Sequence, residues 1–177
     1  VLMQKVAKEL LAMADKIELV KGMAVSYLPA IIRRTLDGTV TGDLCDPGFQ
    51  LNLLEAREKS ILSSLAGKLN AGKKSGASLF DTWMLQESDT VQALAKAFAE
   101  RVVLERLIAT TESCDEGLRP MLNLLRSLFV LARVEEDLGW FLSEEVLTPR
   151  QGRAVSETLR ELCREAAPHA LKLCDAF

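Results

Sequence analysis

The segment with the strongest chemical signature is rich in glycine and lysine. Residues 67–73, Gly-Lys-Leu-Asn-Ala-Gly-Lys, match the first seven positions of a phosphate-binding P-loop. The eighth position should supply a Ser or Thr hydroxyl for magnesium, but Lys74 stands there. A P-loop also follows a strand, whereas this segment follows a helical pattern. We therefore favour a helix end capped at Gly72 over a phosphate site.

The only histidine, His169, lies on an apolar helical stripe and could act as an acid–base group tuned by burial. No Ser, Cys or carboxylate accompanies it in a triad spacing, so a structural role is favoured. Residues 135–137 and 144–145 are acidic, but a helix-bundle di-metal site needs two Glu-x-x-His motifs. We therefore expect no metal site, and we interpret these acids as solvated faces or as ion pairs with Arg133 and Arg150.

Three aromatic residues could line a flat ligand or a partner surface. These are Trp83, Trp140 and Phe141. Aromatic side chains at helical positions more often belong to the core, which is the interpretation that we favour. The residues by themselves therefore predict no active site.

The composition predicts the scaffold that must hold these residues. The 177 residues include 31 Leu and 20 Ala but only 10 Gly and 5 Pro, which favours helices over loops. We expect an all-α fold, a helical bundle of about five helices, several of them long, with antiparallel neighbours. The net charge of −3 and the lack of a dense basic stretch argue against nucleic-acid binding. No run of about 20 apolar residues predicts a membrane span.

Apolar periodicity and capping residues place the helices. Asp46, Ser78 and Thr148 are suitable N-caps, and Pro168 should kink or interrupt the last helix. Residues 15–34 are unclear, and residues 35–47 are expected to form a loop. The expected helices cover residues 1–13, 47–71, 79–111, 118–143 and 149–173.

Several segments, taken together and in order, resemble one known family. They are Val1–Gln4, Asp46–Leu51, Glu100–Leu104, Leu128–Glu135, Gly139–Phe141, Thr148-Pro149 and Asp175–Phe177. This ordered set is similar to the C-terminal helical region of acyl-CoA oxidases, both the long-chain plant type and the bacterial homologues. The resemblance spans nearly all of the chain.

The resemblance implies an FAD-dependent reaction that converts acyl-CoA and O2 to trans-2-enoyl-CoA and hydrogen peroxide. FAD takes a hydride from the β-carbon while a glutamate removes the α-proton. That glutamate belongs to a Glu-Gly motif expected just before Val1, so no catalytic residue is assigned within this chain. FAD is expected to be bound mainly by parts of the protein outside the chain. Gln4, nearest to that motif, is the one candidate for flavin proximity; a solvent-facing glutamine is its alternative.

The resemblance also predicts the organisation of the protein. Residues 1–177 would be the C-terminal helical domain of a larger flavoenzyme, a fragment that is inactive alone. Its partners would be the remaining domains of the same enzyme and a second copy in a homodimer, and the full enzyme would bind acyl-CoA. The location would be peroxisomal, or cytoplasmic if the protein is bacterial. The alternative hypothesis is a stand-alone helical interaction module without enzymatic activity.

Overall fold

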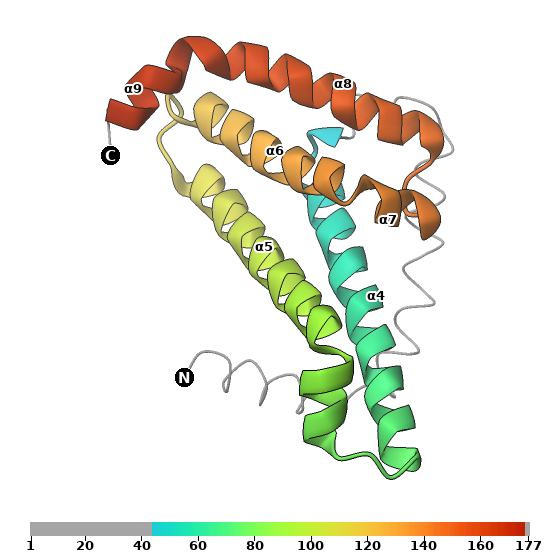
Figure 1. Ribbon diagram of the computed structural model, residues 1–177. Helices are drawn as coiled ribbons and strands as arrows, with labels where there is room; N and C mark the ends of the chain where they lie inside the picture. Colours follow the sequence, from blue (N-terminus) through green and yellow to red (C-terminus); the bar gives the residue numbers. More distant parts are fainter. Residues whose placement is uncertain (1–43, 176–177) are drawn as a thin grey trace. The chain divides into compact units, whose positions relative to one another are not determined.

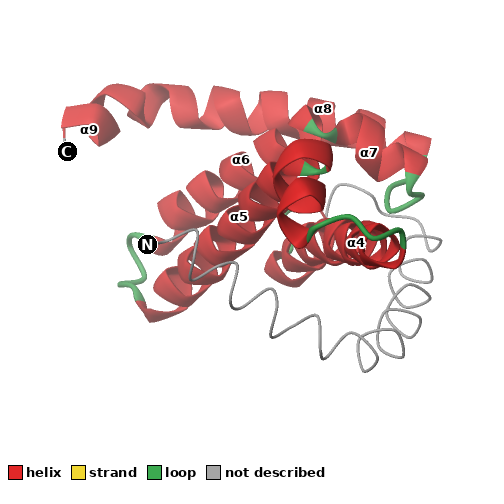
Figure 2. Ribbon diagram, turned by 60° about the horizontal axis from the view of Figure 1, so that its bottom comes forward, coloured by secondary structure: helices red, strands yellow, loops and turns green. Residues whose placement is uncertain are grey.

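The structure, a computed structural model, describes residues 44–175 of the chain and is helical in this range (Figure 1). Figure 2 shows helices joined by short loops, with no strand among the described residues. The predicted all-α fold is therefore confirmed, whereas the helix expected over residues 1–13 and the candidate Gln4 lie outside the described residues. The elements are α4 (Pro47–Lys74), the π-helical η1 (Asp81–Gln86), α5 (Ser88–Ser113), α6 (Arg119–Glu136), α7 (Leu138–Ser143), α8 (Pro149–Ala166), the 3-10 turn η2 (Ala167–His169) and α9 (Ala170–Asp175).

The described residues form two compact units. The hairpin unit comprises residues 54–100, and the C-terminal unit comprises residues 44–53 and 101–175. Helices α4 and α5 each contribute residues to both units. None of the helices described over residues 44–175 combines the length and the apolar character needed to cross a membrane.

All three predicted N-caps make their hydrogen bonds. The Asp46 carboxylate accepts from the backbone N–H of Phe49 at 2.7 Å. The Ser78 hydroxyl accepts from the backbone N–H of Asp81 at 3.0 Å. Thr148 forms a full capping box with Gln151, in which each side chain accepts from the other residue's backbone N–H. These polar side chains satisfy N–H groups that a helix start would otherwise leave unpaired.

Two helices that we expected to be continuous are interrupted. The helix predicted over residues 118–143 breaks at Asp137, which leaves the helical backbone region at φ −106° and ψ 23°. Asp is favoured at helix ends over helix interiors, and a new six-residue helix, α7, begins directly after it. The helix predicted over residues 79–111 similarly contains a π-helical turn and breaks at Glu87, where φ is −123°. The predicted interruption at Pro168 is confirmed, because η2 separates α8 from α9 there.

The predicted cap at Gly72 is wrong. Helix α4 continues to Lys74, and the left-handed residue that follows it is Gly76, with φ +83°. Gly72 instead allows a close approach, because a Cβ atom there would lie 2.5 Å from Oγ1 of the buried Thr82. The absence of a side chain at Gly72 therefore lets the π-helical turn pack against the end of α4.

The core of the hairpin unit joins α4 to the first half of α5. Leu62 and Leu65 of α4 pack with Val91 and Leu94 of α5, and Trp83 of η1 packs against this cluster. The core role that we predicted for Trp83 is thus confirmed. Burial of these side chains away from water stabilises the pairing of the two helices.

The core of the C-terminal unit lies around α6, α7 and α8, with α8 packed along α6 (Figure 1). Phe141 is completely buried and contacts Trp140 edge to face, with ring centroids 5.0 Å apart. A Cβ atom at Gly152 of α8 would lie 3.2 Å from a Leu142 methyl group, so α8 can approach α7 closely. Other fully buried side chains of this unit are Val130, Leu131, Val134, Leu147 and Val155.

Candidate functional site

The most distinctive polar feature of the C-terminal unit is the buried guanidinium of Arg126 on α6, which is 3% exposed. Its Nη1 donates to Oε1 of Gln50 at 2.8 Å. Its Nη2 donates to the carbonyl of Cys45 and to Oδ1 of Asn123, each at 3.1 Å. All three acceptors are neutral, and the buried Nε has no hydrogen-bond partner. The hydrogen bonds that hold this permanent charge inside the unit therefore come from amide and carbonyl dipoles, and Asp46 adds a longer-range attraction.

Gln50 connects this guanidinium to the segment that precedes α4. Its side chain is fully buried, and its Nε2 donates to the carbonyl of Leu44 at 2.8 Å and to the hydroxyl of Ser127 at 3.3 Å. Gln50 belongs to the Asp46–Leu51 segment that carried part of the family resemblance. The amide thus joins residues 44–50 to α6, which lies more than 70 positions further along the chain.

Two hollows open beside Arg126, with volumes of about 320 Å³ and 430 Å³. Pro47, Asn123 and Arg126 line both of them. Glu112 and Arg119 line the first hollow, and Glu165 lines the second. Charges of both signs therefore border these hollows, and neither is a purely cationic cradle.

The chemistry available at this site is binding and positioning. Burial lowers the pKa of Arg126 from its usual value, but a guanidinium remains charged at neutral pH and cannot serve as a general base. The described residues contain no group of three side chains that could hold a metal ion. Neither hollow is lined by a histidine. The arrangement therefore fixes the start of α4 on α6.

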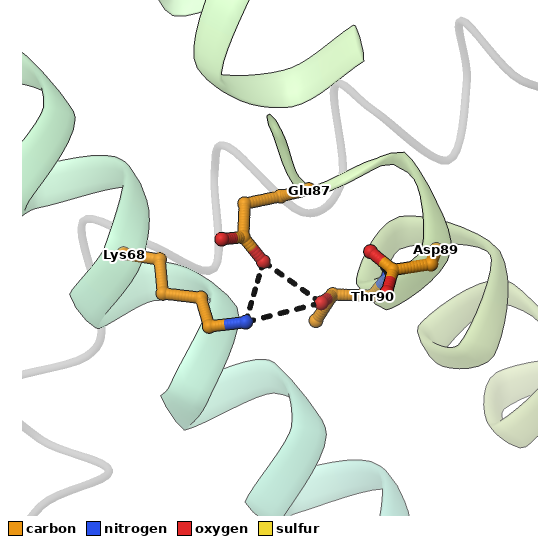
Figure 3. Close-up of polar contacts among 4 residues, drawn as sticks. All are labelled: Lys68, Glu87, Asp89 and Thr90. Carbon is orange, nitrogen blue, oxygen red and sulfur yellow. Dashed lines mark hydrogen bonds and ion pairs between the residues drawn. The ribbon is translucent and has the colours of Figure 1, made fainter. Parts of the chain in front are cut away.

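A second polar cluster lies in the hairpin unit, between α4 and the start of α5 (Figure 3). Lys68 donates to Oε2 of Glu87 at 2.5 Å, and Thr90 donates to the same oxygen at 2.8 Å. These hydrogen bonds, from Lys68 first and Thr90 second, lower the pKa of Glu87. Lys68 is exposed and Glu87 is half-buried, so the cluster orders the break at Glu87 without forming an enclosed site.

The candidate residues from the sequence are not brought together. Residues 67–73 lie inside the last part of α4, which ends at Lys74, and a helix precedes them instead of a strand, so the rejection of a P-loop is confirmed. His169 is exposed in η2. Arg133 forms an ion pair with Glu136 at 3.0 Å, as predicted for the acidic run. Phe141 lies in the core of the C-terminal unit, as predicted, and the half-buried Trp140 packs edge to face on it.

Sequence reasoning missed the role of Arg126. In the sequence this arginine only interrupts an apolar stretch, and its partner Gln50 is 76 positions away. One signal was present: a cation on the same helical stripe as Leu122 and Val130 faces an apolar core unless it has a polar partner.

Over the described residues the fold is all-helical, and its most distinctive polar cluster positions the start of α4 against α6. The family profile of acyl-CoA oxidases matches residues 46–177. The chain belongs to the acyl-CoA oxidase family. The match includes every helix that the structure describes, so the family assignment does not depend on residues 1–45.

The individual relatives agree with this assignment. Peroxisomal acyl-coenzyme A oxidase 1 of Arabidopsis thaliana is 34% identical over 92 residues, which are 51% of this chain and 14% of that protein. Acyl-coenzyme A oxidase 3 of Yarrowia lipolytica is 27% identical over 161 residues, which are 88% of this chain and 22% of that protein. The solved structure of Arabidopsis thaliana acyl-CoA oxidase 1 superposes with a TM-score of 0.68 at 27% identity, covering 77% of this chain. This chain spans 20% of that solved chain.

Proposed function

We propose that this chain is the C-terminal helical domain of an FAD-dependent acyl-CoA oxidase, and that the intact enzyme converts acyl-CoA and O2 to trans-2-enoyl-CoA and hydrogen peroxide. The observation that carries the proposal is the family match over residues 46–177. Within the enzyme, this piece completes the helical core, supports the flavin site and contributes to a homodimer. The glutamate that removes the α-proton lies just before the position of Val1.

The described residues do not fit FAD by themselves. FAD combines a three-ring flavin with two phosphates and an adenosine, so its site needs a long cleft with donors for the phosphates. The hollows beside Arg126 have volumes of about 320 Å³ and 430 Å³, and the Arg126 donors that do form hydrogen bonds are directed at protein oxygens. No catalytic step through FAD follows from residues 44–175. FAD would be held mainly by other parts of the intact enzyme, with Gln4 as the one proposed neighbour in this chain.

The proposed location is the peroxisome. It rests on the relatives, because the Arabidopsis thaliana protein that is 34% identical is named as a peroxisomal enzyme. The proposed substrate class is the fatty acyl-CoA thioesters. It rests on the names of the relatives, which are acyl-coenzyme A oxidases.

The decisive experiment uses the intact polypeptide. The purified protein should show the yellow absorbance of a flavin, and hydrogen peroxide should appear only when acyl-CoA and O2 are both present. Bound flavin without peroxide would indicate a relative that passes electrons to a different acceptor and would overturn the oxidase assignment. A polypeptide without flavin and without a Glu-Gly motif ahead of Val1 would instead support a stand-alone helical interaction module.

A further inference from the structure

One short segment of the hairpin unit presents four large apolar side chains to solvent. Leu79, Phe80, Met84 and Leu85 are 55%, 66%, 48% and 72% exposed, respectively. We call these four residues the tip patch. The other large apolar side chains exposed in the described residues are dispersed over other elements, at Val103, Leu118 and Leu171. Isolated exposed apolar residues are ordinary, whereas a cluster of them marks a surface that binds something.

The tip patch is displayed by an ordered segment. Thr82 is 2% exposed and lies against Gly72, and Trp83 packs on the apolar cluster of the hairpin unit. Ala77 donates from its backbone N–H to the carbonyl of Gly72 at 3.0 Å, which closes the turn after α4. The same segment that buries Thr82 and Trp83 thus holds the tip patch outward.

The backbone at the tip patch is also unusual. Residues 81–86 form a π-helical turn, which is rare and is found frequently at functional sites. The π-helical turn therefore supports a role for the side chains that it presents.

We propose that the tip patch is a docking surface for an apolar face of the remaining part of the same polypeptide. This inference rests on the proposed function, in which this chain is one domain of a longer enzyme. The lengths of the relatives favour the rest of the polypeptide as the partner of the tip patch. The matched region is only 20% of the solved Arabidopsis thaliana structure and 14% of peroxisomal acyl-coenzyme A oxidase 1. The tip patch itself has no charged member, so its partner is expected to be apolar as well.

Two other occupants fit less well. A stable interface between two copies buries about 20 residues on each side, and four side chains are few for that purpose. An anionic lipid surface would repel the exposed carboxylate of Asp81, which belongs to the same turn. Both remain outcomes that the experiment can detect.

The test places a photoreactive benzoylphenylalanine at position 80 of the intact polypeptide. After illumination, we expect a product that migrates as a single chain, with position 80 linked to a peptide outside residues 1–177. The matched control places the same probe at position 171, which is exposed on α9 as an isolated apolar residue. The control should lack this cross-link.

Four outcomes would overturn the proposal: a product of twice the chain mass, links only to residues 1–43, links only to added lipid vesicles, or equal yields at positions 80 and 171. The cross-link does not depend on turnover, so it can form in a protein that makes no peroxide. A missing peroxide signal would therefore reject the proposed function alone, and a missing intrachain cross-link would reject the docking surface alone.

Discussion

Arg57 on α4 and Glu100 on α5 form an ion pair inside the hairpin unit. Their side chains are 3% and 10% exposed, so both charges are almost completely removed from water. A buried ion pair does not necessarily add stability, because the desolvation of both charges offsets their attraction. Its value lies in specificity: it fixes which residue of α4 faces which residue of α5. Glu100 opens one of the segments that resembled the acyl-CoA oxidase family.

We predict that Glu100→Gln destabilises the protein by about 3 kcal/mol, because the buried guanidinium of Arg57 then loses the negative charge opposite it. Chemical denaturation of the variant measures this loss. The double variant Arg57→Met with Glu100→Leu removes both charges and should recover most of the stability. A double variant less stable than Glu100→Gln would show that the pair itself supplies the stability.

The close approach of Gly72 and Thr82 yields a second prediction. Gly72→Ala should destabilise the protein by about 1–3 kcal/mol, because the new methyl group overlaps the buried Thr82 side chain. Gly67→Ala is the matched control, since a Cβ at this other glycine of α4 meets no atom within 4 Å. That control should stabilise the helix by about 0.5–1 kcal/mol. Adding Thr82→Ala to Gly72→Ala should restore part of the loss in thermal unfolding, and no restoration would contradict the proposed contact.

The lowered pKa of Glu87 predicts that the stability of the folded protein depends on pH. The hydrogen bonds that Glu87 accepts from Lys68 and Thr90 lower its pKa in the folded protein relative to the unfolded chain. The stability that it contributes is therefore present above the unfolded pKa and is lost as the pH falls through the folded pKa. The melting temperature of Glu87→Gln should lie below that of the unmodified protein at neutral pH, and the two should converge in acid. The control Glu161→Gln, at an exposed residue of α8, should show no such convergence. A gap that stays constant down to acid pH would refute this prediction.

The hydrogen bonds of Arg126 predict that replacing it with lysine lowers the stability of the protein. Arg126→Lys should cost about 2 kcal/mol in equilibrium unfolding, because one ammonium group cannot reach Gln50, Cys45 and Asn123 in their three directions. Arg119→Lys, at an exposed arginine beside the same hollow, should have little effect. Equal losses in the two variants would mean that the hydrogen bonds of Arg126 do not contribute to stability.

Local signals in the sequence were sufficient to predict most helix starts. Asp46, Ser78 and Thr148 each act within three residues of their own position, so residue type and spacing reveal them directly. The all-α class likewise follows from composition, because abundant Leu and Ala with few Gly and Pro favour helices wherever they occur.

The errors came from interactions between distant residues. Gly72 has the residue type of a helix cap, and only its contact with Thr82, ten positions later, shows why it is a glycine. The Arg126–Gln50 hydrogen bond joins residues 76 positions apart, which no periodicity can reveal. The break at Asp137 is the exception, because it follows from the local preference of Asp for helix ends, which the apolar pattern on either side obscured.

The π-helical turn at residues 81–86 makes the hairpin unit sensitive to chain length as well as to residue type. Trp83 and the pair Val91 and Leu94 contact the same apolar cluster from either side of this turn. Deleting one residue in the first turn of α5, between Glu87 and Val91, would rotate the later residues by about 100° around the helix axis, since an α-helix has 3.6 residues per turn. Such a deletion would turn Val91 and Leu94 away from Leu62 and Leu65 while leaving every remaining side chain unchanged. Relatives that align across this segment should therefore tolerate substitutions there far better than gaps.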